Sequence, residues 1–205
     1  MSSESEESFS SSSLDVEIEN VKPNLSNISI FFSQYSYMSS PIKFLEAVSQ
    51  NYVLSSADLI LAVAMIADYN SIKGCIDKRF KKTLNLLTES ASGTIGFFFC
   101  PRITNVPLNY IYDLYSKLDL TFDYYIIVSR LYKISKEDEN EIFTSFKEFS
   151  PNDLRYFPCF NEEIFLLNSK IKQNTEVNGS QARIHVLSKA EFQTFLKCFA
   201  AELKE

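Results

Sequence analysis

The sequence has few of the residues from which catalytic sites are built. Its 205 residues include one histidine, His185, and four glycines. A Ser/His/Asp or Cys/His site would have to use that histidine, which lies in a predicted strand with no nucleophile motif nearby. Four glycines leave little from which a phosphate-binding loop can be made. The composition therefore argues against an enzyme and favours a structural or surface role for His185.

Cysteines are also sparse, and their spacing argues against a metal site. The four cysteines are far apart in the sequence, with no Cys-x-x-Cys pair: Cys75, Cys100, Cys159 and Cys198. A structural zinc site needs four ligands, which one histidine and dispersed cysteines do not supply. We therefore expect neither a metal nor a cofactor, and we expect the cysteines to act as small buried hydrophobic residues.

Long apolar runs are missing as well. The longest run, residues 59–67, has nine residues, which is about half of a membrane span. The chain begins without a basic segment followed by an apolar one, so no secretory signal peptide is expected. We expect an intracellular protein that does not interact with a membrane.

Positive charge is absent from the first 21 residues, which hold six acidic residues and no lysine or arginine. The remainder is formally neutral, with 20 basic and 20 acidic residues. Nucleic-acid binding relies on a positive field, so this balance argues against direct nucleic-acid binding and is compatible with a basic protein partner. Residues 1–13 are rich in serine and glutamate and are predicted to be a disordered tail. A single domain is expected over residues 14–205.

Two predicted strands and the segment between them organise this domain. Residues 95–100 form a continuous apolar run rich in phenylalanine, which is typical of a strand buried on both faces. Pro107 suits the first position of a helix, and residues 108–118 continue it with an apolar stripe. Residues 122–134 then predict a second strand rich in β-branched residues.

The N-terminal half is predicted to contain further strands and helices. Residues 14–21 alternate between apolar and mostly acidic residues, which indicates a half-buried edge strand. Residues 28–32 are expected to be extended, and a helix is expected over residues 41–51. Over residues 57–68 the residue types favour a helix, whereas the short, continuously apolar run fits a central strand. A longer helix is predicted over residues 71–90.

The C-terminal half begins with an acidic cluster and ends in a hairpin and a helix. The acidic cluster contains Glu137, Asp138, Glu139 and Glu141. Three phenylalanines follow that would form one face of a short helix: Phe143, Phe146 and Phe149. The remaining predictions are an extended segment (156–160), a short helix or strand (162–167), a polar turn (173–180), a last strand (182–187) and a final helix opened by a capping box (188–191).

The central segment carries a resemblance to a known family. It contains Arg102, Ile103, Asn105, Val106 and Pro107, then Leu114 and Tyr115, then the strand from Tyr124 to Arg130. Weaker matches flank it at residues 55–61 and 156–165. In this order the pieces resemble the BCCIP family of eukaryotic nuclear proteins, over about two thirds of the chain. The resemblance implies an α/β (α+β) fold with a mixed, helix-flanked sheet like that of acetyltransferases, without the coenzyme A site. It also favours a strand over residues 57–68.

The resemblance further implies a function. The family's fungal member is a dedicated chaperone for a basic large-subunit ribosomal protein, the universal fourteenth. This implies a non-enzymatic interaction protein in ribosome biogenesis and nuclear transport, located in the nucleus. Two alternatives are a small coenzyme A-dependent acyltransferase and a cell-cycle or DNA-repair adaptor. A loop that binds the coenzyme A pyrophosphate has no good counterpart here, because the close pair Gly93 and Gly96 leads into a strand.

Two sets of residues are candidates for function. The acidic set contains the glutamates of the N-terminal tail and the cluster Glu137, Asp138, Glu139 and Glu141. Either cluster could bind the basic client or form a solubilising surface, and the sequence leaves both interpretations open. Arg102, Asn105 and Pro107 mark the family motif. Its preferred interpretation is structural, with Thr104 and Asn105 capping the turn and Pro107 starting a helix; the alternative is a partner contact. The basic run 78–82 resembles a nuclear import signal, but a solvated helix face is the preferred interpretation.

Overall fold

The computed structural model describes residues 15–22, 24–33, 35, 37–103 and 105–204. The tail predicted over residues 1–13 and the predicted cap at Thr104 lie outside these residues. Within the described part, no helix is long and apolar enough to cross a membrane.

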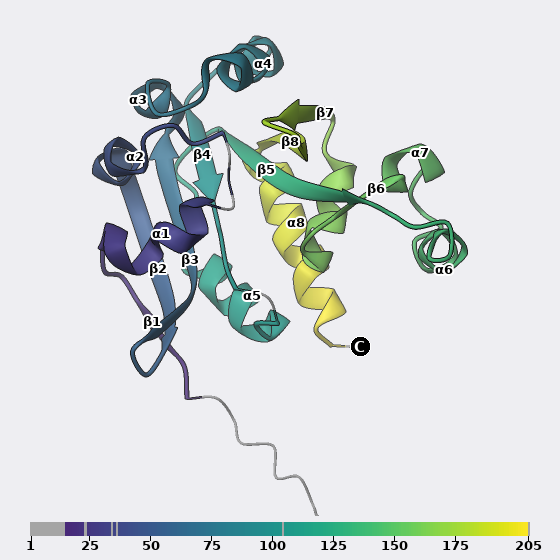
Figure 1. The fold of residues 1–205 in the computed structure, drawn as a ribbon, viewed down its shortest axis with the longest axis horizontal. Helices are drawn as coiled ribbons and strands as arrows, with labels where there is room; N and C mark the ends of the chain where they lie inside the picture. The colour runs from purple at the N-terminus through teal and green to yellow at the C-terminus, as the bar shows by residue number, and fades with distance from the viewer. Residues whose placement is uncertain (1–14, 23, 34, 36, 104, 205) are drawn as a thin grey trace, which may run out of the picture.

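The fold is an α/β domain built on one mixed sheet, as the resemblance implied, and the sheet has eight strands (Figure 1). The strand order is β1-β2-β3-β4-β5-β8-β7, and β6 pairs with β5 outside this path. Only β4 and β5 are parallel among the described pairs. The strands are β1 (Glu17–Glu19), β2 (Val48–Ser56), β3 (Leu59–Asp68), β4 (Ile95–Phe99), β5 (Tyr124–Lys133), β6 (Tyr156–Pro158), β7 (Ile171–Val177) and β8 (Ser180–Ser188).

Helices cover both faces of the sheet. One face packs against α1 (Leu25–Ser33), α2 (Pro41–Ala47), α3 (Tyr69–Ile72) and α4 (Lys78–Thr88). The other packs against α5 (Leu108–Ser116), α8 (Lys189–Glu202) and part of the 3-10 helix η1 (Asn161–Asn168). A smaller lobe, made by α6 (Glu139–Ser145) and α7 (Pro151–Leu154), projects from the body beyond β6 (Figure 1).

The central strands β3 and β4 supply both cores. In β3, Val63 and Met65 face the α1–α4 side, while Ala64 and Ile66 face the α5–α8 side. Burial on both faces explains why a run of helix-favouring Leu, Ala and Met forms a strand, since tertiary packing overrides local propensity. In β4, Gly96 lies so close to Phe122 that an added Cβ would be 2.7 Å from its ring.

Several predicted elements differ in the structure. Residues 28–32 belong to helix α1, because Ile28, Phe31 and Phe32 are buried at helical spacing. The helix predicted over 41–51 ends at Ala47, and β2 begins at the next residue, so Val48 is a strand residue. These errors share a cause, since a segment this short contains too few residues to distinguish the repeat of a helix from that of a strand.

Three further corrections concern boundaries. The helix predicted over 71–90 is broken: α3 ends at Ile72, and α4 begins at Lys78 after Asp77, whose carboxylate accepts hydrogen bonds from Arg79 N and Phe80 N. The polar turn predicted over 173–180 contracts to Asn178 and Gly179, with φ of 51° and 80°. Helix α5 begins at Leu108, which leaves Pro107 at the cap position rather than at the first helical position.

Candidate functional site

The parallel strands β4 and β5 separate at their C-terminal ends. They pair from Ile95 with Tyr124 to Phe98 with Ile127. Beyond this point the chain after β4 turns toward β3, where Val63 N donates to Pro101 O and Ile103 N donates to Leu61 O. Strand β5 instead pairs with β6, from Leu131 with Pro158 to Lys133 with Tyr156. Parallel strands that part in this way leave a gap at their carboxyl ends, which is where ligands commonly bind in open α/β sheets.

In this protein an internal ion pair between Arg102 and Glu162 fills the gap. We call Arg102, Glu162 and the neighbouring Glu163 the plug. Arg102 Nη2 donates to Glu162 Oε2 at 2.7 Å, and the two side chains are 5% and 1% exposed. The Arg102 guanidinium also lies over the ring of Phe160, 4.1 Å from its centroid. Tyr115 Oη donates to Glu162 Oε1 at 3.4 Å. The plug therefore joins the segment after β4 to η1 and α5.

Glu163 is the second carboxylate of the plug. It is 9% exposed and lies beside a cavity of about 10 Å³ that Tyr35, Cys100 and Val128 also line. Burial, and then the charge of Glu162, raise the pKa of Glu163 to about 8. A cavity of this size holds at most about one water molecule. This cavity is therefore too small to hold the pantetheine arm of coenzyme A.

The plug leaves two buried polar atoms without a hydrogen-bond partner among the described residues. These atoms are Arg102 Nη1 and Glu163 Oε2. Arg102 belongs to the motif noted in the sequence, whereas Glu162, Glu163 and Tyr35 were not predicted as site residues. A signal was present, since two adjacent glutamates precede the apolar run 164–167 and buried carboxylates are rare without partners.

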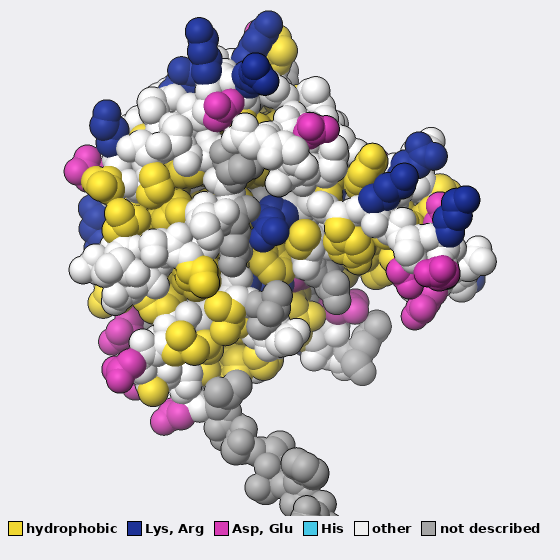
Figure 2. Space-filling model, viewed as in Figure 1, with side chains coloured by type: hydrophobic (Ala, Val, Ile, Leu, Met, Phe, Trp, Pro, Cys, Tyr) yellow, Lys and Arg dark blue, Asp and Glu magenta, His cyan; other side chains and the backbone are white. Residues whose placement is uncertain are grey.

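The four predicted acidic residues lie together on the projecting lobe. Glu137, Asp138, Glu139 and Glu141 are all exposed, at the turn before α6 and in its first half. Figure 2 shows acidic side chains gathered on the lower side of this lobe and basic side chains above them. Carboxylates at a helix N-terminus also interact favourably with the helix dipole. We call these four residues the acidic rim.

The segment that carries the acidic rim is attached to the body by a small hydrophobic core. Phe143, Phe146 and Phe149 pack against a small core that includes Leu154, Phe157 and Ile164. The rings of Phe146 and Phe157 have centroids 5.3 Å apart. The helix α6 ends at Ser145, so Phe146 and Phe149 follow it instead of continuing its face. The predicted docking of this segment on the body by its phenylalanines is nevertheless present.

Asn105 adopts a backbone conformation that few residues tolerate. Its φ is 65°, in the left-handed region, and its side chain is exposed. We expect Asn105→Ala to lower the free energy of unfolding by about 1 kcal/mol, because alanine is strained at this φ. Asn105→Gly should leave it nearly unchanged. Thermal unfolding of both variants tests this; equal stability of all three proteins would remove the structural interpretation of Asn105.

His185 lies on β8 inside the protein. It is 1% exposed, and its Nδ1 is 3.0 Å from Ser169 Oγ. Burial, and then the charge of Arg183, lower the pKa of His185 to about 3. Cys75 and Cys100 are buried, as expected, whereas Cys159 is exposed and Cys198 is half-buried. The described residues include no group of three or more His, Cys, Asp or Glu side chains suited to a metal ion.

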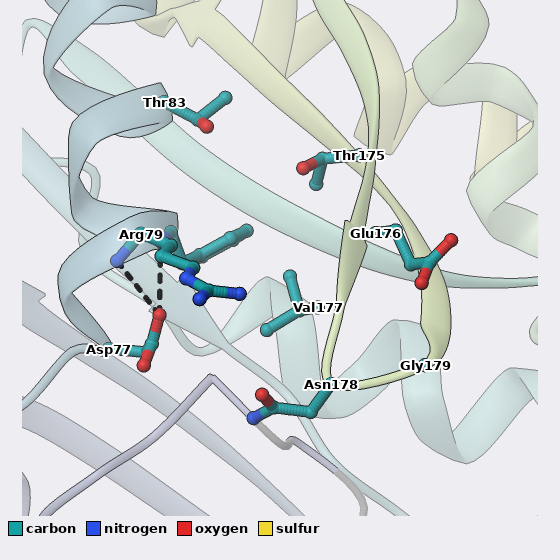
Figure 3. A pocket seen from close by; sticks show the side chains of 9 residues that line it. Asp77, Arg79, Thr83, Thr175, Glu176, Val177, Asn178 and Gly179 are labelled. Carbon is teal, nitrogen blue, oxygen red and sulfur yellow. Dashed lines mark hydrogen bonds between the residues drawn. The ribbon is translucent and has the colours of Figure 1, made fainter.

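A more open hollow lies between the start of α4 and the β7–β8 turn (Figure 3). Its volume is about 300 Å³, and its lining includes Arg79, Thr83, Thr175 and Asn178. Asp77 occupies the first N–H groups of α4, so the helix end is not available to an external anion. Figure 3 shows Glu176 on the side of β7 directed away from α4.

Comparison with known proteins supports the fold. No family model matches the sequence, and no curated protein matches it. Among solved structures, the chain is similar to the crystal structure of BCP1 from Saccharomyces cerevisiae, with a TM-score of 0.55 and 14% sequence identity. The match covers 95% of this chain and 92% of that chain. This likeness is consistent with the fold that the resemblance to the BCCIP family predicted, and the chain has the fold of yeast BCP1.

Proposed function

We propose that this chain is a non-enzymatic interaction protein that binds and escorts a basic protein. Its client on this proposal is a basic protein of the large ribosomal subunit, the universal fourteenth, and its place of work is the nucleus. The observation that carries the proposal is the acidic rim, in which Glu137, Asp138, Glu139 and Glu141 are exposed together on a projecting lobe.

The rim suits a client that arrives by electrostatic attraction. Exposed carboxylates retain their hydration, so each contributes modestly to affinity but adds to a field that speeds association. The packed phenylalanines hold the segment that carries the four exposed carboxylates against the body. A client held in this way should dissociate more readily as salt screens the charges.

The plug supports the non-enzymatic part of the proposal. Arg102 and Glu162 form a buried ion pair in the gap where an acetyltransferase-like sheet would admit its coenzyme. A 10 Å³ cavity remains beside them. We expect acetyl coenzyme A to leave the melting temperature unchanged in a thermal-shift assay. A saturable rise in melting temperature would instead support the acyltransferase alternative.

Co-expression with the proposed client tests the function. We expect the two proteins to elute together in size-exclusion chromatography as a soluble one-to-one complex at about 0.1 M salt, and to separate in part at about 0.5 M salt. The client alone should be poorly soluble under the same conditions. If the client precipitates while this protein elutes alone at both salt concentrations, the proposed client is wrong.

A further inference from the structure

Strand β7 ends the sheet. It spans Ile171–Val177 and pairs with β8 through a two-residue turn at Asn178 and Gly179. Among the described residues β8 is its one strand partner, and the sheet path stops at β7. An edge strand of seven residues presents backbone groups that another strand can pair with. β7 carries neither proline nor glycine, either of which would hinder such pairing.

The register of the hairpin determines which groups face outward. The residues that flank a two-residue turn, here Val177 and Ser180, form a hydrogen-bonded pair, and such pairs alternate along antiparallel strands. The odd-numbered residues of β7 therefore bond to β8. The even-numbered residues direct their N–H and C=O groups to the outer edge: Lys172, Asn174 and Glu176.

This outer edge is complementary to itself. If a second β7 lies antiparallel with a two-fold axis at Asn174, each Asn174 faces its counterpart and each Lys172 faces Glu176 of the other copy. All three of these are hydrogen-bonded pairs, which would give about six backbone hydrogen bonds. Opposite charges directly across a strand pair are stabilising. We propose that β7 is a homodimer edge, at which two copies of this chain join their sheets.

The two charged side chains make contacts within their own chain that leave each of them able to form a further one. Glu176 is exposed, and its Oε2 accepts a hydrogen bond from Gln181 Nε2 at 3.1 Å. Lys172 Nζ donates to Leu167 O at 2.8 Å and to Asp153 Oδ2 at 3.2 Å. An ammonium group has three N–H bonds, so a further one can point to a carboxylate across the edge. Glu176 projects away from α4 (Figure 3), so the helix does not stand between the two charges.

The charge pattern selects a second copy over another extended peptide. Lys172 and Glu176 lie two positions on either side of Asn174. An antiparallel partner pairs with both charges only if it has an acidic residue opposite Lys172 and a basic residue opposite Glu176. A copy of β7 has this order by symmetry. The paired surface contains few apolar side chains, since Gln173, Asn174 and Thr175 form its middle. The dimer is therefore expected to be weak, with a dissociation constant on the order of 100 µM.

Sedimentation velocity of the full chain, from about 5 to 500 µM, tests the proposal. The wild-type protein should move from monomer to dimer over this range. Glu176→Lys places lysines opposite each other and should weaken self-association at least tenfold. The matched control, Glu202→Lys, makes the same charge change at an exposed site on α8 and should behave as wild type.

A charge-swap mixture makes the test specific. Lys172→Glu places glutamates opposite each other and should also weaken self-association at least tenfold. When mixed, the Glu176→Lys and Lys172→Glu chains have opposite charges at both positions, so they should form a mixed dimer. Lys172→Glu loses the contacts of Lys172 with Asp153 and Leu167 and could fail to fold. In that case the comparison of Glu176→Lys with Glu202→Lys still tests whether β7 forms the dimer. A wild-type protein that stays monomeric at 500 µM, or a Glu176→Lys variant that dimerises like wild type, would overturn the proposal.

Discussion

Arg102→Ala is expected to lower the free energy of unfolding by about 3–5 kcal/mol. The substitution leaves Glu162 buried without its cation, because the carboxylate is 2.7 Å from Arg102 Nη2 and its side chain is 1% exposed. It also removes the guanidinium that lies over Phe160. Urea unfolding at neutral pH, followed by circular dichroism, measures the loss. A change below about 1 kcal/mol would show that solvent reaches the pair, as it does for surface ion pairs.

A double substitution separates the ion pair from its surroundings. Arg102→Met together with Glu162→Leu replaces both charges by apolar groups of similar length. We expect this variant to recover much of the stability that Arg102→Ala loses, because neither charge is left unpaired. If the double variant is as unstable as Arg102→Ala, an unpaired Glu162 charge does not explain the lost stability. The loss would then come from the missing contacts of the Arg102–Glu162 pair itself.

Raising the pH from 6.5 to 8 is expected to lower the free energy of unfolding by about 2 kcal/mol. The cause is Glu163, whose pKa burial raises to about 8 from an ordinary value of 4.5. Between these values the folded protein keeps a proton that the unfolded chain releases. Stability is therefore fully present below pH 4.5 and is lost as the pH rises toward 8. Glu163→Gln, which carries no titrating proton, should remove this decline.

His185 acts in the opposite direction at lower pH. Its pKa falls from 6.5 to about 3 on folding, so the unfolded chain binds a proton that the folded protein excludes. This contribution to stability is present above pH 6.5 and is lost as the pH falls toward 3. The two effects offset each other between pH 4.5 and 6.5, so wild type should show a plateau there. Urea titrations of wild type and Glu163→Gln at several pH values test this; equal slopes above pH 6.5 would exclude Glu163 as the cause.

The secondary structure could be predicted where a single local pattern of residues was strong. The phenylalanine-rich β4 and the first half of β5 are short apolar runs rich in aromatic or β-branched residues, which favours buried strands. The capping box before α8 is also present, with Glu191 N donating to Ser188 Oγ at 3.3 Å and Ser188 N donating to Glu191 Oε2 at 2.8 Å. Strand β7 was missed because its residues are mostly polar, and pairing with β8 rather than burial defines it.

The candidate site could be predicted only in part. The acidic rim is a local feature of the sequence, so its four residues were found and their exposure followed from their charge. The plug depends on Arg102 meeting Glu162, which lies 60 residues later in the chain. No local pattern records such a contact. It arises because β4 and β6 pair with successive parts of β5, residues 124–127 and 131–133, and topology of this kind is not encoded in any one segment.

The acidic rim can be tested most directly with two matched triple variants. One neutralises the rim by Glu137→Gln, Glu139→Gln and Glu141→Gln. The control neutralises three exposed or edge-strand acids at the opposite end of the sheet by Asp15→Asn, Glu17→Gln and Glu19→Gln. Both variants change the net charge equally, so a difference between them reports position and not overall charge.

The measurement is the dissociation constant of each variant for the basic ribosomal client at two salt concentrations. We expect the rim variant to bind at least tenfold more weakly than wild type and to lose most of the salt dependence. The control should bind as wild type does. Equal binding by the rim variant and wild type, or an equal loss in both variants, would contradict the proposed role of the rim.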